Sequence, residues 1–397
     1  MVNAATLPDS AGVREPPAVV DLVGFRDDLE ELRRETFASL STKDFKHLQK
    51  IERWGRLASL FGYLTAWTFP NIISAFLLST GQFTRWLLAH HILHKGYDRV
   101  PGIPDRYTSK HFARGWRRFI DWFDWIHPNA WDHEHNSLHH YHTGEDADPD
   151  LTERYLEYLR ALKIPRFFKY CFIGLASISW KYTYYAPNTA SVIDPESKRR
   201  LRHEHIAFIT IKNILDLRNP TVRALWRQSY LPYGIFHFVI IPLLFFPLGE
   251  SAVWAVLINK LLAECLTNLH SFIVVTPNHT ANDLYRYGFH YERKEQFYVT
   301  QVLGTANYRT GTEFIDYWSV WLNYQIEHHL FPDLPMTKYR EIQPKVKALC
   351  EKHGIPYLQE PIFRRVGKML DICVGATSMR NLEAFPEPLY RTAVGLK

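Results

Sequence analysis

The order of apolar and polar residues predicts a helical protein with membrane-spanning segments. Residues 57–78 carry no charged side chain, and they are long enough to cross the apolar core of a bilayer. Pro70 and Asn71 interrupt this stretch, so residues 57–94 could instead form two helices in a tight hairpin. The sequence alone leaves both arrangements open.

A clearer membrane signal lies in the second half of the chain. Residues 231–249 and 252–277 are two long apolar stretches, separated only by Glu250 and Ser251. Each is close to the roughly 20 residues that a helix needs to cross a bilayer. Together they predict a helical hairpin that crosses the membrane and returns.

The flanking segments predict elements outside the bilayer core. Residues 1–20 contain several Pro and Ala and are expected to be a flexible lead, whereas residues 24–56 show the charged, helical pattern of one or two amphipathic surface helices. Residues 166–185 hold an apolar run that is too short to span and is rich in aromatic residues. That run predicts a helix lying at the membrane interface.

Composition supports a partly membrane-embedded chain of 397 residues. Aromatic residues make up 15% of it, with 12 Trp and 22 Tyr, as expected where rings lie at a membrane interface. The net charge of +6 suits an anionic membrane surface, and no nucleic-acid-binding motif is present, so no nucleic acid partner is expected. The four cysteines form no CxxC pair, which argues against a disulfide framework or a zinc ribbon. The N-terminus has neither signal-peptide nor transit-peptide features, so we expect insertion through internal segments.

Histidines crowd into three short stretches. These are residues 90–94 (HHILH), 133–142 (HEHNSLHHYH) and 325–332 (QIEHHLFP). A single histidine is usually a hydrogen-bonded core residue, but three clusters at helical spacing favour metal binding. Imidazole is a common ligand of Zn, Cu, Fe and Ni, so the residue type alone does not select the metal.

Helix geometry explains the spacing within the clusters. His90 and His94 are separated by four residues, which places them on one helix face about 6 Å apart along the axis, within reach of one metal. His135 and His139 repeat this arrangement. His140 is rotated by about 100° on an α-helix and could reach a second metal nearby. His328 and His329 offer another adjacent pair.

Ligand number and setting favour a pair of iron ions. Histidines in this number, with no obvious carboxylate box, exceed one tetrahedral zinc site. Their position beside membrane spans indicates a lipid substrate, and attack on an unactivated C–H bond requires O₂ chemistry at a redox metal, which zinc cannot supply. Two metals, with iron as the preferred element, are therefore expected.

Membrane topology is consistent with one shared site. His94 and His135 are joined by a charged stretch without a spanning segment, so they lie on the same side of the membrane. Between His140 and His328 the predicted hairpin crosses the membrane twice and returns to that side. All three clusters can therefore converge.

These stretches resemble the membrane fatty acid desaturases, whose mark is three histidine boxes of the forms HxxxH, HxxxHH and [HQ]xxHH. The first box reads His90-HIL-His94, the second His135-NSL-His139-His140, and the third Gln325-IE-His328-His329. The strings HNSLHHYHTGEDADPDL and LNYQIEHHLFPDLP are also similar to those of acyl-lipid and front-end desaturases. The resemblance covers about residues 57–357.

The resemblance implies a set of metal ligands. The family has one further ligand just past the cytosolic end of the last spanning helix, and His279 fits that place. The alternative, His270, would lie about 13 Å deeper in the membrane, where we expect it to be a hydrogen-bonded histidine. The implied ligands are His90, His94, His135, His139, His140, His279, His328 and His329.

Other polar residues near the boxes are expected to support these ligands. His91, His133 and His142 are expected to orient the imidazoles, and Asp146, Asp148 and Asp150 to do the same while capping the next helix rather than binding metal. Gln325 replaces histidine in the third box, and a weak or water-mediated metal contact there is left open.

By resemblance, the fold is an all-α integral membrane protein of about four transmembrane helices, with a cytosolic helical cap that holds a di-iron centre. Residues 1–56 are then an N-terminal lead with surface helices, residues 57–357 the desaturase domain, and residues 358–397 a C-terminal tail. The expected location is the endoplasmic reticulum in a eukaryote or the inner membrane in a bacterium, with the active site on the cytosolic side.

The implied activity is O₂-dependent desaturation of a lipid-linked or thioester-linked fatty acyl chain, with two iron ions (Fe²⁺/Fe³⁺) as cofactor. The HPGG haem motif of a fused cytochrome b5 domain is absent, so a separate carrier, cytochrome b5 or ferredoxin, is expected to supply electrons. A lipid hydroxylase on the same scaffold is the main alternative. A metal transporter is a third, but it would require polar residues along the spans.

Overall fold

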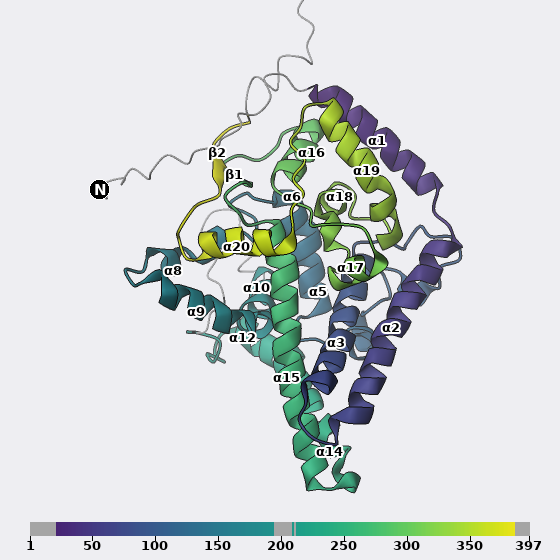
Figure 1. Cartoon of the computed structure of the whole chain (residues 1–397), viewed down its shortest axis with the longest axis vertical. Helices are drawn as coiled ribbons and strands as arrows, with labels where there is room; N and C mark the ends of the chain where they lie inside the picture. The colour runs from purple at the N-terminus through teal and green to yellow at the C-terminus, as the bar shows by residue number, and fades with distance from the viewer. Residues whose placement is uncertain (1–20, 194–208, 210–211, 386–397) are drawn as a thin grey trace, which may run out of the picture.

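The computed structural model describes residues 21–193, 209 and 212–385, which form a broad helical cap above a narrower stem (Figure 1). The described chain is mostly helical, and its one sheet has two short strands. The predicted lead at residues 1–20 and the last part of the predicted tail, residues 386–397, lie outside the described residues. The prediction of an all-α fold is therefore confirmed at the level of secondary structure.

The first stem hairpin consists of α2, Thr42–Ala66, and α3, Ile72–Leu93, preceded by α1, Leu22–Ala38. Ser41 and Asp44 form a capping box at the start of α2, and the Asn71 side chain accepts from the backbone of Ser74 at the start of α3. Residues 57–78 are thus two helices in a tight hairpin and not a single span. The second predicted surface helix does not end near residue 56, because α2 continues into the stem.

The second hairpin also matches the prediction. Among the described residues, two helices are long and apolar enough to cross a membrane, Pro220–Leu248 and Glu250–Asn278. The first contains α12, Pro220–Leu225, α13, Leu231–Ile235, and α14, Ile241–Leu243, joined by π-helical turns at Trp226–Tyr230 and Phe236–Ile240. The second is built on α15, Glu250–Val275. The hairpin begins earlier than predicted, because the helix continues through the polar residues before Leu231.

A few buried polar side chains join the two hairpins. The Asn259 amide on α15 donates to the carbonyl oxygens of Ala66 and Phe69 at 2.9 and 3.0 Å, and its oxygen accepts from the Asn71 backbone at 2.8 Å. Further up α15, the Thr267 hydroxyl contacts Ser79 of α3 at 3.0 Å. Such hydrogen bonds are a usual means of association between helices in apolar surroundings. They fix the first hairpin against α15.

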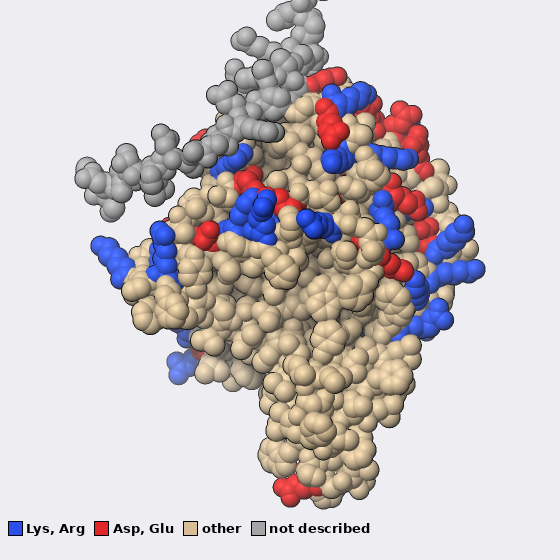
Figure 2. Space-filling model, viewed as in Figure 1, with Lys and Arg blue, Asp and Glu red and all other residues tan. Residues whose placement is uncertain are grey.

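The surface of the stem is apolar. Figure 2 shows that its visible face lacks Lys, Arg, Asp and Glu except for acidic atoms at the tip, whereas charged side chains gather on the cap. Exposed apolar side chains on the stem include Leu60, Phe61, Leu64, Ile73, Phe76, Val239, Leu243, Leu244, Trp254, Ile258 and Leu261. A continuous apolar surface of this kind marks a region that contacts lipid or another protein.

The cap is assembled from short helices around large aromatic side chains. Trp131, Trp321, Tyr185 and Tyr339 are among its most buried residues. The helices, in chain order, are α4, Arg118–Asp121, α5, Pro128–Trp131, α6, His140–His142, α7, Thr152–Tyr155, α8, Glu157–Ala161, α9, Arg166–Ser177, α10, Ala186–Ile193, α16, Lys294–Leu303, α17, Glu313–Trp318, α18, Gln325–Leu330, α19, Met336–Lys352, and α20, Ile362–Cys373. Strands β1, Tyr285–Tyr287, and β2, Arg380–Leu382, pair in parallel.

Two contacts hold the ends of the described chain on the cap. Helix α1 packs against α16 and α19 (Figure 1). Helix α20 lies across the upper end of α15, and the buried Arg365 guanidinium donates to the Pro277 carbonyl oxygen at 3.3 Å and to Asp283 at 2.6 Å. The segment that follows the last stem helix is therefore held in place from the C-terminal side.

The short apolar run at residues 166–185 contains α9, as predicted. Phe167, Phe168, Phe172 and Leu175 of this helix are exposed, whereas Lys169 is buried and donates to the Arg160 carbonyl oxygen. The apolar residues thus face outward. Placement of α9 at a membrane interface remains a prediction that this exposure supports.

Close packing of α2 on α3 should make the hairpin sensitive to added volume. A β-carbon on Gly55 would meet Thr84 Cβ at 2.5 Å. We expect Gly55→Val to lower the free energy of unfolding by about 1–3 kcal/mol, the usual cost of overpacking. The measurement is thermal denaturation of the detergent-purified protein. Gly174→Val on α9, where no atom lies within 4 Å of the new β-carbon, is the matched control. Equal melting temperatures for the two variants would contradict the close packing of α2 on α3 at Gly55.

Candidate metal centre

The three histidine boxes meet inside the cap, at the upper end of the stem. One ring nitrogen from each of His90, His94, His135 and His328 lies within 4.8 Å of the others, and the same holds for His139, His279 and His329. The first group combines the end of α3, the second box and α18, and the second group adds His279, which follows the 3₁₀ turn Thr276–Asn278 after α15. The structure therefore brings seven of the eight predicted ligands into two adjacent groups.

His140, the eighth, lies between the two groups. Its ring centroid is 4.6 Å from that of His94 and 4.9 Å from that of His135 in the first group, and 4.2 Å from that of His329 in the second. Its side chain is buried. All eight predicted histidines consequently share one interior region.

The second box is π-helical over Asp132–His139, which the spacing did not predict. The His140 N–H donates to the His135 carbonyl oxygen, an i to i+5 bond, so His140 lies one wide turn above His135. On an α-helix, five residues at 100° each would rotate His140 by about 140° from His135. The wider turn instead keeps His135, His139 and His140 on one side, facing both groups.

Buried nitrogens without partners show that these side chains fit a metal. Within the described part of the chain, both ring nitrogens of His135 and His140 and the Nε2 atoms of His94 and His329 are buried and have no hydrogen-bond partner. The Nε2 atoms of His90 and His328 face each other at 3.0 Å. Buried polar groups are normally hydrogen-bonded, so convergent unpartnered nitrogens indicate a site for a cation.

The protonation state also suits coordination. Burial, followed by the neighbouring histidines, holds the pKa of His135, His140, His328 and His329 well below the ordinary value. These imidazoles are therefore neutral near pH 7. A neutral ring nitrogen is the form that binds a metal.

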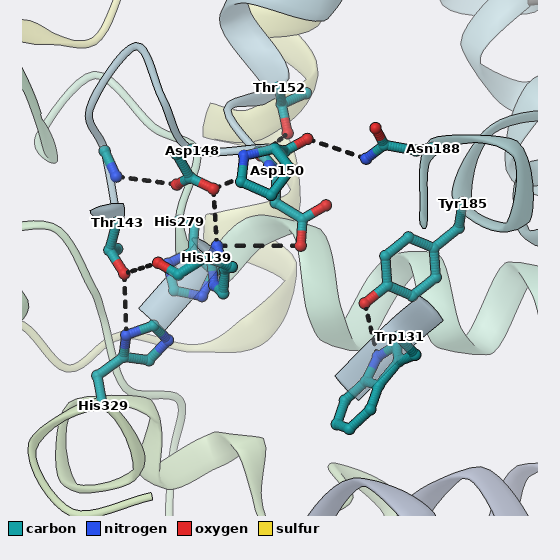
Figure 3. A network of polar contacts seen from close by, with 12 residues as sticks. Trp131, His139, Thr143, Asp148, Asp150, Thr152, Tyr185, Asn188, His279 and His329 are labelled. Atoms are coloured by element: carbon teal, nitrogen blue, oxygen red, sulfur yellow. Dashed lines mark hydrogen bonds and ion pairs between the residues drawn. The ribbon is translucent and has the colours of Figure 1, made fainter. Parts of the chain in front are cut away.

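The outward nitrogens of several of these histidines have fixed partners. His328 Nδ1 lies 3.1 Å from the Tyr339 hydroxyl, and His329 Nδ1 lies 2.8 Å from the Gln301 side-chain oxygen. His139 Nδ1 donates to Asp148 Oδ1 at 2.9 Å (Figure 3). Histidines that bind metals usually donate their second N–H in this way, which orients the ring and fixes its tautomer.

The aspartates after the second box play different parts. Asp148 is buried and also accepts from the Gly144 backbone at 2.9 Å, so it fixes the turn as well as His139. Asp150 has an oxygen 3.9 Å from His139 Nδ1 and, with His135 and His139, forms a further group of ligating atoms (Figure 3). Asp146 is exposed and pairs with Arg286. Helix α7 starts after Leu151 without a side-chain cap, so the predicted capping role is wrong.

His270 and Gln325 occupy supporting positions. His270 Nε2 donates to the Trp318 carbonyl oxygen at 2.8 Å, and its ring lies between those of Phe83 and Trp318. It is absent from the groups of ligating atoms found in the described residues. Gln325 Nε2 donates to His279 Nε2 at 2.8 Å, and its oxygen accepts from Asn278 at 3.1 Å. Gln325 therefore contacts a candidate ligand.

The other histidines of the boxes point elsewhere. His91 Nε2 donates to the Val320 carbonyl oxygen at 2.9 Å, which ties the end of α3 to the loop before α18. Val320 and Trp321 both have left-handed backbones, with φ of 50° and 60°, a costly conformation for a β-branched or bulky residue. His142 pairs with Glu145, away from the two groups. Its predicted role of orienting a ligand is replaced by this contact.

Two buried carboxyl groups beside the boxes were not predicted. Glu134 is fully buried, and within the described residues neither of its oxygens has a hydrogen-bond partner. Burial, with Asp150 and Asp148 nearby, raises the pKa of Glu134 well above the ordinary value. Glu327 accepts from Asn307 at 2.8 Å and Tyr357 at 2.7 Å, and burial raises its pKa to about 7. The sequence did not predict their burial, because it depends on tertiary packing around the boxes and not on a local pattern.

The chain is similar in sequence to several fatty acid desaturases. The chain is 26% identical to the NADPH-dependent stearoyl-CoA 9-desaturase of Mycobacterium tuberculosis over 365 residues, which is 88% of this chain and 76% of that protein. It is 26% identical to fatty acid desaturase 3 of Bos taurus over 312 residues, 74% of this chain and 59% of that protein. A segment of 57 residues, 14% of this chain and 13% of the relative, is 44% identical to the acyl-lipid (8-3)-desaturase of Thraustochytrium sp.

The extent of these matches differs. The chain spans less than two thirds of the length of the cattle and Thraustochytrium relatives, and about three quarters of the mycobacterial one. The sequence profile described as fatty acid desaturase matches residues 65–361, which include all three boxes and His279. With most of its length matched, the chain belongs to the fatty acid desaturase family.

Proposed function

We propose that the protein is an O₂-dependent desaturase of a lipid-linked or thioester-linked fatty acyl chain, with two iron ions held by histidines. The observation that carries this proposal is the pair of adjacent groups of converging imidazole nitrogens, with His140 between them. One mononuclear site would leave several of these nitrogens buried without partners. Membership of the family supports iron as the metal and an acyl chain as the substrate.

The residues would share the metals according to the two groups. His90, His94, His135 and His328 would hold one iron, and His139, His279 and His329 the other, with His140 able to reach either. When bound, the iron pair supplies the O₂ chemistry that removes one hydrogen from each of two adjacent methylenes. O₂ is reduced to two waters with two electrons from the substrate and two from a carrier, cytochrome b5 or ferredoxin.

The chain itself would position the ligands and exclude water. Tyr339, Gln301 and Asp148 hold the outward nitrogens of His328, His329 and His139, so the inward nitrogens point to fixed places. All eight candidate ligands except the half-buried His279 are buried. The protein would then determine which C–C bond reacts by presenting one bond of the acyl chain to the metals.

The membrane arrangement completes the proposal. Helices α2 and α3 would form one membrane hairpin and residues 220–248 with α15 the other, which gives four membrane helices with an apolar outer surface. The cap would lie on the cytosolic side, in the endoplasmic reticulum or the bacterial inner membrane. Residues 57–357 would form the catalytic unit. The mycobacterial relative is named for a CoA thioester and the Thraustochytrium relative for an acyl lipid, so both linkages are retained for this chain.

Lipid analysis after heterologous expression tests the activity. We expect cells that express the protein to accumulate acyl chains lighter by two hydrogens, as measured by mass spectrometry of total lipids against a vector control. Acyl chains heavier by one oxygen would show a hydroxylase instead. Unchanged lipids in cells that contain iron-loaded protein and a supplied electron carrier would reject both oxygenase functions.

The ligand assignment is tested by a pair of histidines near the end of α15. His279→Ala should remove a ligand and lower the iron content and the activity of the purified protein, because three ring nitrogens meet at that group. His270→Ala should keep the iron, since His270 contacts only rings and a backbone oxygen in the contacts observed. The iron content of both purified variants is measured and compared with that of the wild type. The reverse result would show that His270 is the ligand.

The orienting role of Asp148 gives a graded effect. Asp148→Asn removes the charge that holds the His139 N–H, and we expect a loss of about 10- to 100-fold in iron affinity or activity, as for other groups that orient a metal ligand. Asp146→Asn, from the same segment but exposed, is the control and should behave like the wild type. Iron titration and turnover measured in parallel would detect the difference. Equal losses in the two variants would assign the effect to the segment and not to His139.

A further inference from the structure

A further cluster of ligating side chains lies outside the two groups of the candidate iron centre. His142 Nδ1 is 2.9 Å from Glu145 Oε2, and His290 Nδ1 is 2.9 Å from Glu145 Oε1 and 3.1 Å from its other oxygen. The ring centroids of the two histidines are 5.1 Å apart. One ligating atom of each residue lies within 4.8 Å of the other two. Two imidazole nitrogens and a carboxylate therefore converge on one point.

The backbone fixes this convergence. The Glu145 N–H donates to the His142 carbonyl oxygen at 2.8 Å, and the Tyr287 N–H donates to the Gly144 carbonyl oxygen at 2.8 Å. Gly144 has φ of +79°, and a β-carbon there would lie 3.0 Å from the Tyr285 carbonyl oxygen, so only glycine suits this close approach. The segment after the second box is thus attached to the end of β1 by a backbone hydrogen bond, independently of the side-chain contacts.

The distances fit a first-row divalent cation. Ligands at 2.0–2.1 Å in a tetrahedral zinc site lie about 3.3 Å from one another, so the two N···O distances need to open by only a few tenths of an ångström. The side chains of His290 and His142 are 53% and 27% exposed, which leaves room for water as a fourth ligand. Among the described residues, Glu145 forms ion pairs with these two histidines and with no Lys or Arg. No fixed cation therefore competes for the carboxylate.

We propose that His142, Glu145 and His290 form a surface metal site that takes a borderline divalent cation such as Zn²⁺. Two neutral imidazoles and one carboxylate are a frequent ligand set for this ion. In the cation-bound form, each imidazole carries its proton on Nε2 and coordinates through Nδ1, and the Glu145 carboxylate binds the cation instead of accepting two N–H bonds. The bound ion fastens the chain just after the second histidine box to the chain just after β1.

The test measures metal content and thermal stability of the iron-loaded, detergent-purified protein. After brief treatment with a weak chelator, Zn²⁺ is titrated while iron is quantified in the same samples. We expect the wild type to bind one Zn²⁺ per chain without loss of iron and to melt at a higher temperature when Zn²⁺ is present. Co²⁺ in place of Zn²⁺ should give the visible absorption of a four- or five-coordinate ion.

Variants in both segments make the test specific. Glu145→Gln and His290→Gln should each weaken Zn²⁺ binding by about 100-fold or more and abolish the Zn²⁺-dependent rise in melting temperature, with iron content unchanged. His111→Gln, an exposed histidine elsewhere on the cap, should match the wild type. If Glu145→Gln fails to fold, the more exposed His290→Gln still decides the question. Absence of Zn²⁺ binding by the wild type, or equal binding by wild type and variants, would overturn the proposal and leave a hydrogen-bonded His–Glu–His contact only.

Discussion

The interaction on which the arrangement depends is the approach of several buried imidazole nitrogens to one another without hydrogen-bond partners. Each unsatisfied buried polar atom costs about 1–3 kcal/mol, and water cannot reach these nitrogens to reduce the cost. Both ring nitrogens of His135 and of His140 are in this state. Packing alone does not explain why unpartnered ring nitrogens converge in the interior. A shared cation does, because its bonds to the nitrogens offset the free-energy cost of burying them. The surrounding fold can be understood as the means of keeping these nitrogens together.

That task is divided among elements that are distant in the sequence. The ring of His328 is held by Tyr339 from α19, that of His329 by Gln301 from α16, and that of His139 by Asp148 from the same turn. The anchors lie on separate elements, so a shift of α16 or α19 would tilt one of the rings. The stem contributes through α3 and α15, whose upper ends supply His90, His94 and, one turn later, His279. The polar contacts of Asn259 and Thr267 hold those two helices at a fixed offset.

The sequence predicted the parts of this structure that follow from regular periodicity. The separation of His90 and His94 on α3 and the second hairpin both use the geometry of an α-helix, which the chain follows there. The choice of His279 over His270 as a ligand rests on the family resemblance and stays a prediction, which the place of His279 in the second group supports. The π-helical second box was not predictable in this way, because its extra residue per turn leaves no mark on an i, i+4 pattern. The roles of the second-box aspartates also depend on tertiary contacts. Asp146 and Asp148 are only two residues apart in the sequence, yet one is exposed and the other is buried against His139.

The turn that follows the second box and contacts β1 takes part in two groups of side-chain contacts within a few residues. His139 and His140 belong to the candidate iron centre, His142 pairs with the buried Glu145 outside it, and Asp148 contacts His139. Asp148 Oδ2 accepts from the Gly144 backbone, while the Gly144 carbonyl oxygen accepts from Tyr287, so the inner and outer contacts share one glycine. A displacement of this turn would therefore move the His139 ring and the Glu145 carboxylate together. A short turn that is held by two backbone hydrogen bonds resists such displacement. An ion bound by His142, Glu145 and His290 would therefore also restrict the position of His139 in the iron centre. The two sites would then be coupled through the backbone of this turn and not through charge alone.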